Sequence, residues 1–278
     1  MGMFCYQCQE AAKNIGCEIR GVCGKNEEVA NLQDVLMYAL KGLSSAVIQS
    51  GMKVEELKEI NHEMVRSLFM TITNANFDEA AIEAQIRKMV NLRNQFIEET
   101  SMNCTIKAAT FKAGTREEML GLAKEAGVLA TENEDIRSLR ELILYGLKGM
   151  AAYTEHALNI GKENPAIYGF MHEALAAALN DDLSVAALVA MTLKTGQYGV
   201  EAMALLDAAN TSRFGSPEIT QVNIGVRNNP AILISGHDLV DLEQLMEQTK
   251  GTGVDVYTHS EMLPAHYYPL FKKYDNLV

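Results

Sequence analysis

The distribution of proline limits the fold of this chain more than any other feature. All five prolines lie after residue 164 of the 278 residues. Because proline breaks the interior of a helix, a proline-free stretch of this length favours long helices. Apolar residues recur there every three or four positions in three successive segments, so each segment has one helical stripe. The stripes are Val29, Leu32, Leu36, Leu40, Leu43 and Val47; Leu57, Ile60, Met64, Leu68 and Ile72; and Ile82, Ile86, Met89 and Phe96.

An internal repeat divides the helical region. Leu32–Ser45 and Leu139–Ala152 share Leu, Tyr, Leu, Lys and Gly at an offset of 107 residues. Similarity at a fixed offset indicates repeated units, although two unrelated amphipathic helices would also share apolar positions. We predict a helical domain over 27–215 that contains two related bundles, at about 27–100 and 134–212. Asp78 is expected to cap the third helix, and Thr115 with Glu118 to form a capping box.

The pattern changes near Ser216 and Pro217. Residues 231–235 form a short apolar run that predicts a buried strand, and residues 254–258 predict a second strand. Between them, Asp238 can cap a helix that ends at Gly251, which makes a β-α-β unit with a parallel crossover. About twenty residues follow, too few to cover both faces of a parallel pair. Residues 216–278 are therefore expected to be the beginning of an incomplete α/β domain.

Charge and composition argue against several classes of partner and location. The 24 basic and 36 acidic residues give a net charge of −12, which disfavours nucleic acid and anionic membranes as partners. No apolar run is long enough for a transmembrane helix. The first residues lack the basic and apolar regions of a secretory signal. We therefore expect a protein of the reducing cytoplasm, in which cysteines serve as thiolates.

Four of the five cysteines lie within the first 23 residues, at Cys5, Cys8, Cys17 and Cys23. Four thiolates suit zinc or an iron–sulfur cluster. The spacing C-x2-C-x8-C-x5-C favours iron–sulfur, because structural zinc sites more often repeat the two-residue spacing in the second pair. Zinc and cysteines without a ligand role remain open on spacing alone. Glycines at 16, 21 and 24 and basic residues at 13, 20 and 25 surround the cysteines. Cys104 is expected to be a small buried residue.

His237 and Glu261 form a second candidate site. Each follows a predicted strand, and the carboxyl ends of neighbouring parallel strands are where ligands bind in open α/β sheets. An imidazole and a carboxylate there could bind a transition metal, or could serve only as loop and capping groups. His259 and His266 flank the same loop and compete with His237. The remaining histidines, at 62, 156 and 172, fall within helical patterns and are expected at surfaces or against partner helices.

Four segments together resemble the hybrid-cluster protein family, also called the prismane or hydroxylamine reductase family. They are Met3–Gln9, Gly21–Lys25, Ala231–Leu239 and Val256–Ala265. The resemblance implies a pair of three-helix bundles followed by a Rossmann-like parallel sheet. It implies a [4Fe–4S] cluster on Cys5, Cys8, Cys17 and Cys23, in the spacing of anaerobe-type members. It further implies that His237 and Glu261 are ligands of the hybrid iron–sulfur–oxygen cluster that binds substrate.

The implied activity is reduction of hydroxylamine to ammonia and water, or of nitric oxide, in the nitrogen metabolism of anaerobes. A redox protein would donate the electrons. Family members extend past residue 278 and supply further cysteines and a second glutamate there. The chain is thus expected to be an N-terminal, electron-entry portion that is inactive alone, with a hybrid cluster only in a complete protein or beside a C-terminal companion chain. The alternatives are a stand-alone iron–sulfur electron-transfer protein and a zinc-stabilised helical interaction module.

Overall fold

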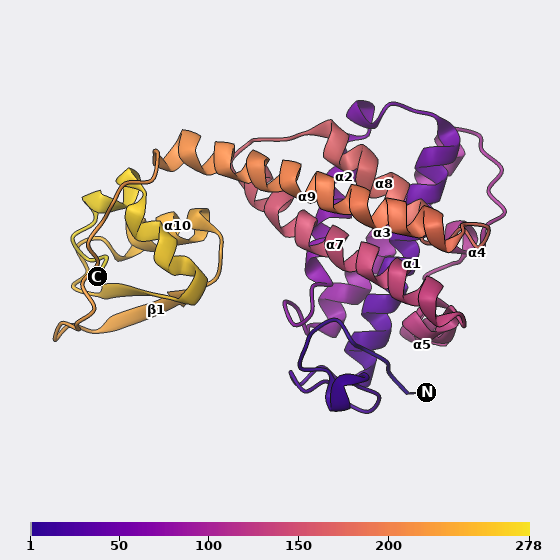
Figure 1. The fold of residues 1–278 in the computed structure, drawn as a ribbon, viewed down its shortest axis with the longest axis horizontal. Helices are drawn as coiled ribbons and strands as arrows, with labels where there is room; N and C mark the ends of the chain where they lie inside the picture. Colours follow the sequence, from indigo (N-terminus) through magenta and orange to yellow (C-terminus); the bar gives the residue numbers. More distant parts are fainter. Residues whose placement is uncertain (1) are drawn as a thin grey trace. The chain divides into compact units, whose positions relative to one another are not determined.

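The computed structural model describes residues 2–278 and is mainly α-helical, as predicted. Helices α1 (Glu27–Ser50), α2 (Lys58–Met70) and α3 (Glu79–Glu99) follow the N-terminal loop. α1 is in contact with α2 and α3, and also with α8 (Pro165–Ala177) (Figure 1). The expected stripe of α1 is buried at every position from Val29 to Val47. The apolar periodicity therefore identified the faces that form the core.

Side-chain caps fix where several helices begin. Asp78 accepts a hydrogen bond from the backbone N–H of Ala81 and starts α3. Thr115 and Glu118 form the predicted capping box of α5 (Arg116–Gly121). Asn26 caps α1 in the same way, with its Oδ1 accepting from the N–H of Val29. These caps satisfy backbone donors that a helix cannot pair internally.

Short helices and turns connect the longer helices: α4 (Lys107–Thr110), α6 (Ala123–Ala126) and the single turns η2 (Val54–Glu56) and η3 (Val128–Ala130). α4 packs directly on α1 at Gly42, where a Cβ atom would lie 1.9 Å from the backbone oxygen of Ala108. Arg93 holds this segment, donating to the backbone oxygens of Ala108 and Phe111 at 2.9 and 2.5 Å. The close approach therefore needs a residue without a side chain at position 42.

The helical series continues with α7 (Glu134–Asn159), α8 and α9 (Val185–Phe214), in the same long, short, long order as α1 to α3. The chain divides into two compact units, and the divisions fall within α7 and α9. The first covers the chain up to Glu155 and Asn164–Ala202, and the second covers His156–Glu163 and Met203–Val278. Common ancestry of the two helical series stays a prediction.

The second unit contains the small parallel sheet. β1 (Ala231–Ser235) pairs with β2 (Asp255–His259), with Ala231 opposite Asp255 and Ser235 opposite His259. α10 (Leu239–Thr249) connects the strands and is capped by Asp238, as predicted. Its buried residues pack with Phe214, Val256 and Phe271. The last turns, η4 (Ser260–Tyr267) and η5 (Pro269–Lys273), complete this core.

Two expectations from the sequence are wrong. β1 is not buried: four of its five residues are exposed, and Leu233 retains 67% of its surface. The apolar run predicted cover on both faces, but Ile234 is the residue of β1 that packs against the core of α10, Val256 and the C-terminal turns. Cys104 is half-buried, and its Sγ lies 3.7 Å from Oε1 of Gln49. Within residues 2–278, no helix combines the length and apolar character needed to cross a membrane.

Candidate metal centre

The N-terminal cysteines lie on a loop that folds back on itself. Cys5 and Cys17 form an isolated antiparallel bridge, in which each backbone N–H donates to the other residue's carbonyl, at 3.1 and 2.8 Å. Residues opposed in this way project their side chains to the same face. The turn η1 (Ala12–Asn14) reverses the chain between them, with Lys13 and Asn14 at positive φ. The fold therefore pairs two cysteines that are twelve residues apart.

Backbone groups of the loop lie close to the cysteine sulfur atoms. The N–H of Ala12 donates to Cys17 Sγ at 3.4 Å, a type of hydrogen bond that tunes iron–sulfur clusters. Gly21 leaves room beside Cys23, because a Cβ atom at position 21 would lie 3.1 Å from Cys23 Sγ. The glycine at this position thus keeps space for a sulfur ligand, as the local composition suggested.

Three of the four cysteines share one cavity of about 360 Å³. Cys5, Cys8 and Cys23 line it together with Val22 and four polar residues: Gln7, Glu10, Thr73 and Asn74. Cys17 is buried next to it as the partner of Cys5. No group of three or more metal-binding side chains converges within residues 2–278. The donor set and the hydrogen bond to sulfur nevertheless fit a four-thiolate cluster, which would draw the sulfur atoms inward.

The protonation of Cys5 depends mainly on burial, which raises the pKa of its thiol. A backbone hydrogen bond at Gln7 and the charge of Lys25 act in the opposite direction on that pKa. Because a metal binds the thiolate, occupation of the site would release the thiol protons. All five cysteines are free of disulfides, so the four candidate ligands are available.

His237 and Glu261 lie in the second unit at equivalent places beyond the paired strands. Since Ser235 is opposite His259, each candidate follows its strand by two residues. The strand register therefore brings the two candidates to the same end of the sheet, as the β-α-β prediction required. Both side chains are exposed.

The competing histidines have other partners. His259 Nδ1 lies 3.2 Å from Ser235 Oγ, and His266 Nε2 lies 3.0 Å from Thr258 Oγ1. Burial lowers the pKa of His266. His172, expected at a surface or against a partner helix, is fully buried between α1 and α2, in contact with Ser44 and Asn61.

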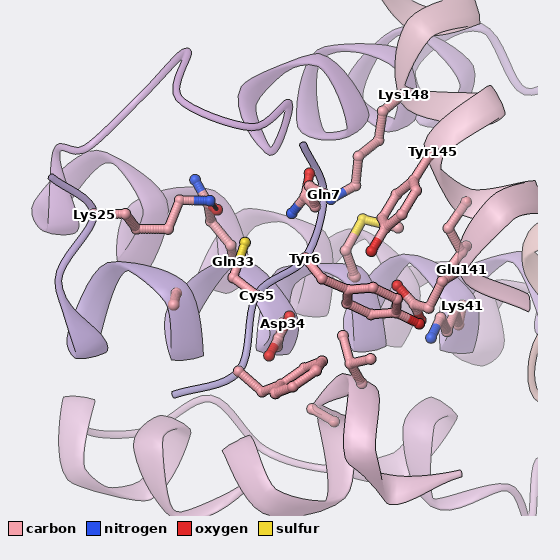
Figure 2. Close-up of a pocket in the computed structure, with 16 residues that line it drawn as sticks. Cys5, Tyr6, Gln7, Lys25, Gln33, Asp34, Lys41, Glu141, Tyr145 and Lys148 are labelled. Carbon is pink, nitrogen blue, oxygen red and sulfur yellow. Dashed lines mark hydrogen bonds between the residues drawn. The ribbon is translucent and has the colours of Figure 1, made fainter. Parts of the chain in front are cut away.

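A cluster of buried charges that the sequence patterns did not predict lies beside Cys5. Figure 2 shows Asp34, Lys41, Glu141 and Lys148 around a small cavity that Cys5 and Tyr6 also line. Burial raises the pKa of the Asp34 carboxyl and lowers that of Lys148 to about 8, while Glu141 and Asp34 favour the charged form of the lysine. The signal was present in the repeat, since Asp34 and Glu141 stand at equivalent positions, 107 residues apart.

Comparison with known proteins identifies the class. Residues 3–278 match the Prismane/CO dehydrogenase family, so the chain belongs to this family, and membership implies iron–sulfur clusters.

The relatives carry a more specific name. The chain is 66% identical over 278 residues to a hydroxylamine reductase of Acetivibrio thermocellus, covering 100% of this chain and 51% of that protein. It is 57% and 56% identical to hydroxylamine reductases of Clostridium perfringens and Parabacteroides distasonis, in each case over 99% of this chain and 51% of the relative. The chain thus spans about half the length of the curated relatives it matches.

Proposed function

We propose that this chain is the electron-entry portion of a hydroxylamine reductase, with a [4Fe–4S] cluster on Cys5, Cys8, Cys17 and Cys23. The observation that carries the proposal is the shared cavity of three of these cysteines, with the fourth paired to Cys5 by two backbone hydrogen bonds. The family match and the names of the relatives agree with it. When bound, such a cluster supplies one-electron transfer.

The loop residues have separate parts in this proposal. Cys5 and Cys17 are held by the backbone bridge, and the buried Cys17 sulfur accepts from the Ala12 N–H. Cys8 and Cys23 are exposed, so the cluster they complete would lie close to solvent. A surface position suits electron exchange with a separate donor protein. Free thiols are consistent with a location in the reducing cytoplasm, which we include in the proposal.

The reduction itself belongs to the whole protein. Hydroxylamine takes up two electrons and two protons, its N–O bond breaks, and the products are ammonia and water. We assign His237 and Glu261 as ligands of the hybrid cluster, because the strand register brings both to one end of the sheet. The remaining ligands would come from the part of the relatives that this chain does not span. Nitric oxide is the second candidate substrate.

Iron and acid-labile sulfide content, measured on the chain purified without oxygen, tests the cluster assignment. About four of each per chain support it, whereas stoichiometric zinc without sulfide would support a zinc-stabilised helical module. Hydroxylamine turnover then separates the remaining possibilities. A chain that carries the cluster, accepts electrons and lacks turnover without further polypeptide fits the electron-entry portion. Turnover by the 278 residues alone would contradict the assignment of the missing ligands.

A further inference from the structure

The internal repeat carries three polar residues besides its apolar stripe. An acid, a tyrosine and a lysine occur at positions i, i+4 and i+7 of both copies, so they lie on one face of each helix. In α1 they are Asp34, Tyr38 and Lys41, and in α7 they are Glu141, Tyr145 and Lys148. Polar residues of this size on a buried face need partners, because an isolated buried charge is strongly unfavourable.

The fold turns the two copies toward one another. The acid and the lysine of both copies line a single cavity of about 20 Å³, which has room for one water molecule. Figure 2 shows Lys41 beside Glu141, with Asp34 and Lys148 on the other sides of the cavity. Lys25 from the cysteine loop also lines it. Three ammonium groups thus face two carboxylates, which leaves an excess of positive charge.

The copies differ at the tyrosine. Tyr38 is buried away from this cavity and donates to Glu125 Oε1 at 2.6 Å. The hydroxyl of Tyr145 is buried at the cavity and has no hydrogen-bond partner among residues 2–278. Its ring packs edge-on against Tyr6, with centroids 6.1 Å apart. The tyrosine of the second copy therefore packs against the cysteine loop, whereas the tyrosine of the first copy does not line the cavity.

The two lysines of the motif, Lys41 and Lys148, also differ in their surroundings. Both lysines line the cavity with Cys5, but only Lys148 belongs to the copy whose tyrosine packs against Tyr6 of the cysteine loop. Lys148 is buried, with 5% of its surface exposed, and its ammonium donates to the backbone oxygen of Thr71 at 3.1 Å. A charge held in a poorly hydrated position exerts a stronger field than one at the surface.

We propose that the two copies of the acid–tyrosine–lysine motif form a buried charge-compensation site for the cluster, in which Lys148 is a positioning residue that stabilises the reduced state. The inference rests on the proposed cluster at Cys5, Cys8, Cys17 and Cys23. A low-potential one-electron donor adds one negative charge to the four-thiolate centre, and no covalent bond forms or breaks. Lys148 lowers the energy of that added charge, since nearby charges set the potential of such clusters.

The test is a redox titration of the anaerobically reconstituted chain at pH 7, with dithionite as reductant and the electron paramagnetic resonance signal of the reduced cluster as readout. In Lys148→Met the equilibrium constant for reduction of the cluster should fall about tenfold. For a one-electron couple this is a shift of about 59 mV to lower potential. Lys148→Arg should restore the potential, because it keeps the charge. Asp34→Asn should shift the potential upward by less than a full charge would, because burial raises the pKa of Asp34 to about 7 and its carboxyl is only partly ionised at pH 7.

Lys41→Met is the matched control, since it removes the lysine of the copy whose tyrosine turns away from the cysteine loop. Its shift should be smaller than that of Lys148→Met. Circular dichroism and iron content confirm that each variant is folded and loaded. Loaded Lys148→Met and Asp34→Asn proteins with the wild-type potential would overturn the inference and leave the cluster assignment intact. If Lys148→Met does not fold, the inference is tested by Asp34→Asn alone, and a wild-type potential in that loaded variant would overturn it. A wild-type chain without iron and sulfide would instead contradict the proposed function.

Discussion

Cys5 and Cys17 exchange both of their backbone hydrogen bonds, at 3.1 and 2.8 Å, across a loop of eleven intervening residues. These two hydrogen bonds hold Cys5 and Cys17 opposite one another. Cys8 and Cys23 are exposed and line the cavity from other turns of the loop. The four candidate ligands thus consist of an ordered pair and two more accessible thiols.

Replacing an accessible thiol should remove the cluster without unfolding the protein. For Cys8→Ser we expect a large loss of iron and sulfide with an unchanged helical circular dichroism spectrum, because Cys8 is exposed and lies outside the helices. Cys104→Ser is the control, since Cys104 does not line the cysteine cavity. Equal iron content in Cys8→Ser and the wild type would remove Cys8 from the ligand set.

The hybrid-cluster assignment is tested in a full-length relative or a complete protein. His237→Ala and Glu261→Ala should each abolish hydroxylamine turnover, because each removes a proposed ligand of the hybrid cluster. Iron at the N-terminal cluster should be retained, since both residues belong to the other compact unit. His259→Ala is the control, and its turnover should stay near the wild-type rate. Full turnover in Glu261→Ala would rule that carboxylate out as a ligand.

His172 should make stability depend on pH. Burial lowers the pKa of His172 from the usual 6.5 of a histidine to about 3. Below pH 6.5 the unfolded chain binds a proton that the folded chain does not, so stability is lost as the pH falls. The loss is about 1.4 kcal/mol per pH unit, or roughly 2 kcal/mol between pH 7 and pH 5. Urea unfolding of the wild type and His172→Gln measures it.

His172→Gln should be less stable at pH 7, because His172 links Ser44 to Asn61 at 3.0 and 3.1 Å. The difference between the two proteins should shrink by roughly 2 kcal/mol at pH 5, since glutamine does not titrate. A difference that is constant with pH would mean that His172 is not held neutral by burial.

The glycines of the repeat should respond in opposite ways. Gly42→Ala should lower the free energy of unfolding by roughly 1–3 kcal/mol, because its Cβ would overlap the backbone oxygen of Ala108. At the equivalent Gly149 a Cβ atom would meet nothing within 4 Å. Gly149→Ala should therefore raise the free energy of unfolding by up to about 1 kcal/mol, through helix propensity. Thermal and urea denaturation compare the pair, and equal effects would contradict the close approach of α4.

Patterns within short stretches of the sequence were enough to predict the helices and to identify the candidate ligands. The stripe of α1 and the caps at Asp78, Thr115 and Asp238 depend on residues within one or two turns, so periodicity and capping preferences identified them. The β-α-β pairing followed from an apolar run, a cap and a second run. The failure at β1 has a physical reason: an apolar strand predicts that something covers it, but periodicity cannot say where that cover lies.

The sequence by itself determined which residues form helices, which thiols can bind a metal and which positions repeat at an offset of 107. Only the tertiary structure decided which of those positions meet. Asp34 and Glu141 line the same cavity because α1 and α7 meet there, and Tyr145 lies at that cavity whereas Tyr38 is buried against Glu125 instead. Contacts between residues so far apart in the chain depend on how whole helices pack. No pattern within a single helix contains that information.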